Sequence, residues 1–412
     1  MPSRRRKVLF ISPSYCCAPL NGGGQRTQLF FEALKAACDV DVLIVGGAND
    51  ARAASAFPGA GEIFFGVNRQ PGRTLPFSLV RRFSERKVDQ IATALLPTEN
   101  LYRADGAMNA SLEALDLSSY ALIVGRYLRT TARTGVLARA DAPPVLVDID
   151  DRDDHPFEER LASPDLSFGM RMILKRHVRD IRRIMAPLVA RARGLWVTSE
   201  ADAPHMRHPY VAVLPNIPFH QPGDGYNLDA AAQSRTLLYV GTSGYAPNYD
   251  GVSRFLERCW PAIAAADPQA RFRIVGGGWE RLGALAQKTP GVELAGFCDD
   301  LTMEYENAAF CVAPVYYGGG TKIKVIEALA FGRAVVAATH AAYGFPKERI
   351  GGALTTADDD KAMIDACIAL LQDPSRRMAA KQAGEALAAA GYSREGFARI
   401  VLSSCERALA GA

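Results

Sequence analysis

One stretch of the chain joins an apolar run, three consecutive glycines and a helical pattern, and this order constrains the fold more than any other feature. Residues 310–317 are apolar and strand-like, and the glycines at 318–320 follow directly. Glycine lets a backbone approach a ligand closely because it has no Cβ. Ile323, Ile326 and Ala330 then recur on one face of a helix. The free N–H groups and positive dipole end of such a helix suit a phosphate.

The polar side chains that follow these glycines extend the prediction from a phosphate to a nucleotide sugar. Thr321 can donate a hydroxyl hydrogen, and Lys322 and Lys324 add positive charge near the start of the helix. Glu327 lies about two turns farther on, where its carboxylate could accept hydrogen bonds from two sugar hydroxyls. The stretch therefore predicts a nucleotide-sugar site, and a glycine-rich turn before an ordinary helix is the alternative.

The first half of the chain alternates between strand-like and helical segments. Residues 7–11 form an apolar run, residues 22–24 a predicted glycine loop, and residues 28–37 a helical pattern. Strand-like residues 39–45 complete a βαβ unit, which predicts a parallel sheet. Further apolar runs continue the sheet at residues 121–124, 145–149 and 194–198. Two longer helices are predicted at residues 78–96 and 167–192. Pro187 is expected to kink or end the second of them.

A proline- and glycine-rich stretch, residues 215–234, interrupts the alternation and is interpreted as a linker. The alternation restarts beyond it, with predicted strands at residues 236–241, 271–275, 292–296, 310–314 and 334–338. Helices are predicted at residues 249–266, from residue 279, and at residues 323–330, 358–371, 375–390 and 393–409. We therefore predict an α/β protein of two Rossmann-like, doubly wound domains, residues 1–214 and 235–390, facing a central cleft. Residues 391–412 are predicted to form a C-terminal helix that packs back toward the first domain.

Charge is distributed unevenly along the chain. Residues 1–215 carry 29 Lys and Arg against 23 Asp and Glu, whereas residues 216–412 carry 19 against 21. The basic excess gathers at residues 4–7, 81–82 and 171–193. A basic first half fits an anionic membrane surface or an anionic acceptor, and solvated helix faces are the alternative. No nucleic-acid partner is predicted.

Cysteine and histidine spacing bears on compartment and metals. The eight cysteines form no CxxC pair and the six histidines show no metal-ligand spacing. This usage predicts a reducing, cytoplasmic environment and no metal site. No apolar run reaches the roughly 18 residues of a membrane span, and the apolar run behind the basic start is too short for a signal peptide.

Several segments together resemble a known family. They are residues 239–242, Pro247-Asn248, residues 273–276, residues 318–330, Gly332 and Val335-Val336, with the loop Asn21 to Arg26 in the first half. This set resembles the GT-B glycosyltransferases, and more narrowly the retaining family 4 enzymes that build bacterial surface polysaccharides. The resemblance implies a hexosyltransferase that moves a sugar from a nucleoside-diphosphate sugar to a glycan or lipid-linked acceptor. It implies no cofactor, UDP favoured over GDP, and action in the cytoplasm or at the inner membrane face.

The resemblance also implies roles for residues of the second domain, which would bind the donor. Glu327 matches the carboxylate that binds the ribose hydroxyls. A second glutamate is usual eight positions earlier, where this chain has Gly319, so the loop backbone and Thr321 would take over its contact. The stretch 242–248 lacks the usual basic pair for the diphosphate, and Lys322 and Lys324 are the predicted substitutes. A solvent-facing charge is the alternative for Lys324. The full predicted donor set is Glu327, Gly319, Gly320, Thr321, Lys322, Lys324, Asn248, and Gly22, Gly23 and Gly24 from the opposite domain.

An acidic cluster supplies the predicted catalytic residues of the first domain. Asp148, Asp150 and Asp151 follow a predicted strand, and strand ends carry functional groups in doubly wound sheets. A carboxylate here could orient or deprotonate an acceptor hydroxyl, or hold a hydroxyl of the donor sugar. A helix cap, a DxD-like metal site and a base at His155 are the alternatives.

Two arginines of the first domain are candidates for contact with the acceptor or phosphate. They are Arg26, behind the glycine loop, and Arg126, behind a predicted strand. A buried pair between Arg126 and one of the aspartates is an equal alternative.

Four rival functions remain open at the level of sequence. A GT-B epimerase would need other acidic residues, and a phosphorylase would need a cofactor lysine. A dinucleotide oxidoreductase would need a clean GxGxxG with an acidic residue ~20 positions on, which neither glycine loop provides. The position of Gly319 and the missing basic pair also allow a catalytically inactive GT-B scaffold.

Overall fold

The computed structural model describes residues 5–19, 21–46, 54–66, 98–103, 112, 115–161, 166–223, 225–227, 232–318, 321–345, 350–378 and 380–411. The chain forms two compact units. Unit 1 comprises Met1–Leu214 and Ala398–Ala412, and unit 2 comprises Pro215–Phe397. Each unit is an α/β structure built on a parallel sheet, as the alternation of apolar and helical segments predicts.

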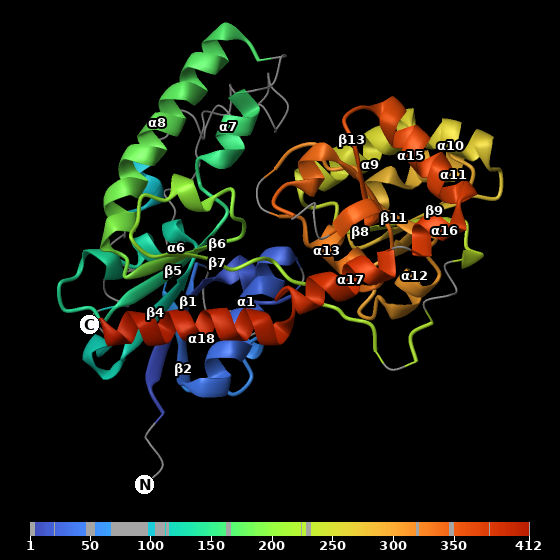
Figure 1. Ribbon diagram of the computed structural model, residues 1–412. Coiled ribbons are helices and arrows are strands. Elements are labelled where there is room, and N and C mark those ends of the chain that lie inside the picture. The colour runs from blue at the N-terminus through green and yellow to red at the C-terminus, as the bar shows by residue number, and fades with distance from the viewer. Residues whose placement is uncertain are drawn as a thin grey trace. The chain divides into compact units, whose positions relative to one another are not determined.

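Unit 1 holds a seven-stranded sheet in the order β3-β2-β1-β4-β5-β6-β7 (Figure 1). The strands are β1 (Lys7–Pro13), β2 (Asp39–Val45), β3 (Ile63–Gly66), β4 (Leu122–Arg126), β5 (Val145–Asp150), β6 (Gly194–Val197) and β7 (Val211–Val213). Every neighbouring pair is parallel. The central strands read as near-continuous apolar runs because both faces of the sheet are covered.

The helices of unit 1 are α1 (Gly22–Ala37), α6 (Leu128–Arg133), α7 (His155–Leu161) and α8 (Phe168–Arg191). Short 3₁₀ turns lie at Ser14–Cys16, Thr98–Leu101, Leu117–Ser119, Val136–Ala138 and Ala203–His205. The C-terminal helix α18 (Arg394–Ala410) lies in unit 1 from residue 398 onward. It is fixed there by the indole N–H of Trp196, which donates to the Ser404 hydroxyl at 3.0 Å.

Unit 2 holds a six-stranded parallel sheet in the order β10-β9-β8-β11-β12-β13. The strands are β8 (Thr236–Val240), β9 (Arg271–Val275), β10 (Val292–Gly296), β11 (Phe310–Ala313), β12 (Val335–Ala338) and β13 (Leu354–Ala357). The helices are α9 (Ala246–Arg258), α10 (Trp260–Ala266), α11 (Gly283–Lys288), α12 (Thr302–Glu306), α13 (Ile323–Ala330), α15 (Asp360–Gln372), α16 (Pro374–Met378) and α17 (Ala380–Ala389). Short 3₁₀ turns lie at Trp279–Leu282, Thr339–Ala342 and Gly351–Ala353.

Several predicted elements differ from the observed ones. Gly22 to Gly24 form the first turn of α1 and not a loop, because the Asn21 side chain caps the helix by accepting from the Gly24 N–H at 2.9 Å. Pro187 lies inside α8 and does not end it. The helix predicted at residues 249–266 is two helices, α9 and α10, on either side of Cys259. The helix predicted at residues 78–96 lies outside the described residues.

Candidate functional site

The carboxyl ends of the unit 2 strands gather at one edge of the sheet, where α13 begins. Glu327 is the fifth residue of α13 and is 3% exposed. Its Oε2 accepts from the His220 backbone N–H and from His220 Nδ1, each at 3.1 Å, and its Oε1 accepts from the Tyr305 hydroxyl at 3.1 Å. The hydrogen bond that His220 donates to Glu327 raises the pKa of His220 above its ordinary value despite partial burial.

Lys324 presents a partly buried amine at the same helix end. Its Nζ donates to the Tyr239 hydroxyl at 2.7 Å and to Asn248 Oδ1 at 2.6 Å, so it is not a solvent-facing charge. Asn248 is oriented for this contact because its own Nδ2 donates to the Thr242 carbonyl at 2.8 Å. Within the described part of the chain, no carboxylate forms an ion pair with Lys324. Burial, and then the nearby charge of Lys322, lower the pKa of Lys324 well below its ordinary value.

Two side-chain hydrogen bonds fix the loop that precedes α13. Lys322 Nζ donates to the Gly318 carbonyl at 2.7 Å, and the Thr321 hydroxyl accepts from Asn216 Nδ2 at 2.8 Å. Gly318 has φ = 104°, which favours glycine, and a Cβ there would collide with Tyr245. Gly319 and Gly320, both predicted donor residues, lie outside the described residues.

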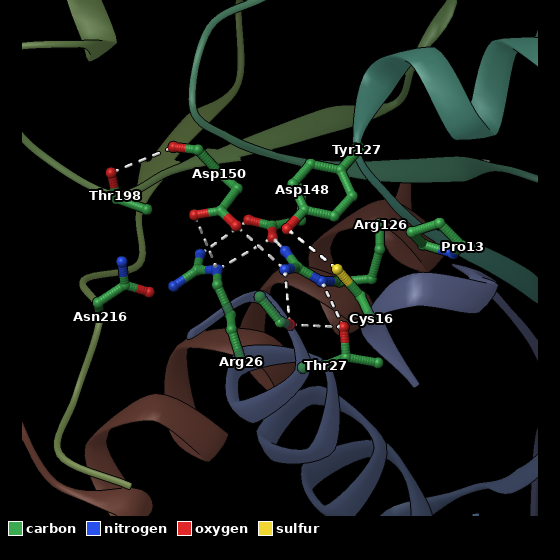
Figure 2. Close-up of polar contacts among 12 residues, drawn as sticks. Pro13, Cys16, Arg26, Thr27, Arg126, Tyr127, Asp148, Asp150, Thr198 and Asn216 are labelled. Atoms are coloured by element: carbon green, nitrogen blue, oxygen red, sulfur yellow. Dashed lines mark hydrogen bonds and ion pairs between the residues drawn. The ribbon is translucent and has the colours of Figure 1, made fainter. Parts of the chain in front are cut away.

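A cluster of four charged side chains occupies the corresponding edge of the unit 1 sheet (Figure 2). Arg26 from α1 and Arg126 from the end of β4 converge on Asp148 and Asp150 of β5. The side chains of both arginines are at most 1% exposed and that of Asp148 is fully buried, whereas the Asp150 side chain is 13% exposed. Both Asp148 oxygens are taken up by the two guanidinium groups. Asp148 therefore positions the two arginines. Arg126 forms the buried pair with an aspartate that is the predicted alternative to a contact with acceptor or phosphate.

Asp150 is held in an unusual backbone conformation beside this cluster. Its φ is 57°, and the pairing of β5 with β6 shifts register between Asp148 and Asp150. Tyr127, at the end of the neighbouring strand, also has a positive φ of 62°. Such conformations persist only where the surrounding structure fixes them, and they concentrate at functional sites. Burial would raise the pKa of Asp150, but the charges of Arg126 and Arg26 outweigh it and lower that pKa.

Two other predicted features of unit 1 have structural explanations. Asp151 lies 3.3 Å from His155 Nδ1, one turn along the chain, in a pair at the start of α7. A Cβ at Gly24 would collide with the Ala18 carbonyl, and one at Gly23 would lie 2.6 Å from the Tyr127 hydroxyl. Tight packing of the α1 N-terminus therefore accounts for these two glycines without any ligand.

Comparison with known proteins shows the class to which this fold belongs. Residues 234–373 match the model of the family described as glycosyl transferases group 1. This segment, which lies within unit 2, is thus similar to the glycosyltransferase domains of that family. At the level of sequence, no curated protein matches the chain.

Solved structures similar to this glycosyltransferase have the same GT-B architecture over nearly the whole chain. Sucrose-phosphate synthase from Thermosynechococcus elongatus is 18% identical, with a TM-score of 0.66 over 99% of this chain and 100% of its own. HepE from Anabaena in complex with UDP-glucose is 15% identical, with a TM-score of 0.62 over 98% and 100% of the two chains. An Escherichia coli structure bound with UDP-2-fluoro glucose is 10% identical, with a TM-score of 0.61 over 97% and 98%. These neighbours confirm the predicted fold class, and the family match of residues 234–373 supports the predicted glycosyltransferase class.

Sequence reasoning missed several side chains of the glycosyltransferase's two edge sites. His220, Tyr305 and Asn216 contact predicted donor residues from far away in the chain, and Tyr127 adjoins the aspartates. The position of Tyr127 directly after Arg126 at a strand end was the one available signal. In the described segments, no three His, Cys, Asp or Glu side chains are arranged to hold a metal ion. No helix in the described part of the chain is both long and apolar enough to cross a bilayer.

Proposed function

We propose that this glycosyltransferase moves a hexose from a nucleoside-diphosphate sugar, with UDP favoured over GDP, to a hydroxyl of a glycan or lipid-linked acceptor. The observation that carries the proposal is the arrangement at the start of α13. There a buried carboxylate, Glu327, and a partly buried amine, Lys324, lie one helical turn apart, and no carboxylate among the described residues pairs with that amine. A carboxylate that can accept hydrogen bonds from two hydroxyls, next to a cationic group, matches the ribose and the diphosphate of a sugar nucleotide.

The chemistry required of the donor site is neutralisation of the departing diphosphate. Negative charge develops on that group as the bond to the anomeric carbon breaks, and fixed donors aimed at it lower the barrier. In our proposal Lys324 and Lys322 supply this charge, with Tyr239 and Asn248 holding Lys324 in place. Thr321 and the glycines before it would contact the donor in place of the usual second glutamate.

The chemistry required of the acceptor site is orientation of a hydroxyl. We propose that Asp150 accepts a hydrogen bond from the attacking hydroxyl or from a hydroxyl of the donor sugar. Arg126 and Arg26 lower the pKa of Asp150, which favours an ionised acceptor of hydrogen bonds over a strong base. Retention of configuration, and a role in surface polysaccharide synthesis at the inner membrane face, rest on the resemblance to family 4 enzymes.

Thermal shift with a panel of nucleotides tests the donor site. We expect UDP to raise the melting temperature more than GDP, ADP or NAD does, and the shift to shrink in Glu327→Ala. Glu304→Gln is the matched control, because Glu304 also lies in unit 2 but belongs to α12, where it pairs with Arg273 of β9. If no nucleoside diphosphate and no nucleotide sugar shifts the wild-type transition, the proposal is wrong.

A further inference from the structure

The outward face of α8 carries large apolar side chains that contact little of the protein. Phe168 is 82% exposed, Met172 is 54% exposed and Ile173 is 39% exposed. Phe168 is the most exposed large apolar side chain in the described part of the chain, and these three lie within six residues. The buried residues of α8 begin only at Leu174. The first turn and a half of α8 therefore extends beyond the hydrophobic core against which the rest of the helix packs.

The same face of α8 is strongly basic. The helix contains six arginines and one lysine against a single acidic residue, Asp180. The side chains of Arg176, Arg179 and Arg183 are 78%, 75% and 75% exposed. Arg176 and Arg179 share Asp180 at 3.6 and 3.9 Å, so one carboxylate cannot neutralise both. Arg183 pairs with the exposed Glu99 at 3.5 Å, so these three arginines meet two carboxylates and the face keeps a net positive charge.

Helical spacing combines these groups into one surface. Phe168, Met172, Arg176, Arg179 and Arg183 follow each other at intervals of three or four residues, which places them along one side of the helix. The buried side chains occupy the opposite side. A helix of this length spans roughly 36 Å, so the surface has an apolar tip and a long basic flank.

The topology of unit 1 places the apolar tip on the functional edge of the sheet. β5 ends at Asp150, and the chain then passes through α7 and α8 before it returns to β6. A helix between parallel strands runs back across the sheet, so α8 begins at the edge where β5 ends. Figure 1 shows α8 projecting past that edge. Phe168 and Asp150 thus lie toward the same end of unit 1.

We propose that the outward face of α8 docks on an anionic lipid bilayer. Exposed apolar side chains among arginines on a helix with a polar face are typical of helices that lie in the membrane interface. Each cation near such a surface gains from the negative lipid headgroups, and the apolar tip inserts among them. This inference deepens the proposed function, because a bilayer at this edge would present a lipid-linked acceptor on the Asp150 side.

Vesicle cosedimentation tests the surface directly. The wild-type chain should bind vesicles of phosphatidylglycerol and phosphatidylcholine but not vesicles of phosphatidylcholine alone, and binding should weaken as salt is raised, because ions screen surface charge. Two variants should each lower the partition coefficient at least about tenfold. One removes the apolar tip, with Phe168→Ser and Met172→Ser. The other removes the basic flank, with Arg176→Gln, Arg179→Gln and Arg183→Gln.

Matched controls come from unit 2. Met303→Ser removes a side chain that is 59% exposed, and Arg258→Gln with Arg281→Gln and Lys288→Gln removes three exposed cations. Both controls should bind vesicles as the wild type does. The proposal is overturned if the wild type does not bind anionic vesicles, whether or not the face mediates self-association instead. It is also overturned if the α8 variants bind vesicles as well as the wild type does. Vesicle binding without any thermal shift by UDP would support the docking surface and overturn only the proposed donor chemistry.

Discussion

Arg26 and Asp148 form a two-point ion pair inside unit 1, with Nη2 to Oδ1 at 2.7 Å and Nε to Oδ2 at 3.0 Å. Arg126 contacts the same carboxylate, so one buried anion holds two buried cations. The same two arginines also contact Asp150, at 3.9 Å from Arg26 and 3.1 Å from Arg126, and the Asp150 side chain is partly exposed. Asp148 therefore helps to hold the arginines that face the candidate acceptor site.

Asp148→Asn should destabilise the protein severely. The change leaves two buried guanidinium groups with one fewer carboxylate, and removing one partner of a buried ion pair costs about 3–5 kcal/mol. Urea unfolding of Asp148→Asn and of a surface control variant measures the loss of stability. The control is Asp141→Asn, whose carboxylate pairs with Arg139 at the surface and whose loss should leave the unfolding midpoint unchanged. Equal midpoints for the two variants would contradict a structural role for Asp148.

Asp150→Asn should abolish most transfer in a protein that still folds, because both arginines keep the buried Asp148 as a partner. Asparagine also tolerates a positive φ, so the backbone at this position can be kept. Loss of a carboxylate that orients the reacting hydroxyl should lower the rate about 10²-fold or more. His155→Ala should retain activity, since His155 pairs with Asp151 instead. Activity lost in His155→Ala and kept in Asp150→Asn would move the catalytic role to the histidine.

Binding of UDP should be accompanied by proton uptake at Lys324. The pKa of Lys324 is depressed in the empty site, and a bound diphosphate favours the charged amine, so binding raises that pKa. Affinity should consequently fall as pH rises above the depressed pKa. Calorimetry over a series of pH values, in buffers of different ionisation enthalpy, counts the protons. Lys324→Met should bind more weakly with no uptake; uptake that persists in this variant would assign the proton to another group.

His220→Gln should remove stability that depends on pH. The pKa of His220 is raised in the folded state, so its contribution is fully present below the unfolded value of about 6.5 and is lost as pH rises through the folded pKa. A hydrogen bond to a charged group stabilises by about 1–3 kcal/mol. Denaturant unfolding should show a larger gap between wild type and variant at pH 6 than at pH 9. The exposed His205→Gln should show no such trend, and a gap that widens toward high pH would contradict the ion pair with Glu327.

The order of strands and helices could be predicted because each strand is a short apolar run ended by a turn. Residues 7–11 and 145–149 lie within β1 and β5, for example. The start of α1 could not be predicted, because glycine disfavours a helix. The Asn21 cap and the close packing of Gly24 against Ala18 together place these glycines in its first turn. Packing also determines which aspartate is buried: Asp148 and Asp150 are two residues apart, and a register shift separates their environments.

Contacts distant in sequence account for the rest of what sequence reasoning missed. His220 and Glu327 are 107 positions apart, and neither shows a local pattern that pairs them. The same holds for Arg26 and Asp148, which are 122 positions apart. Spacing could place Glu327 on α13, but only the folded sheet shows that its oxygens accept from His220 and Tyr305. The functional roles of the predicted site residues stay predictions.

Release of UDP from UDP-sugars tests the central claim most directly. The wild type should liberate UDP from at least one UDP-hexose, by transfer or by slow hydrolysis. Glu327→Gln should lower kcat/KM at least about tenfold, because the ribose loses its anionic acceptor. Glu304→Gln should match the wild type. A wild-type chain that binds UDP yet releases none from any nucleotide sugar, with or without acceptor glycans and lipids, would contradict the account.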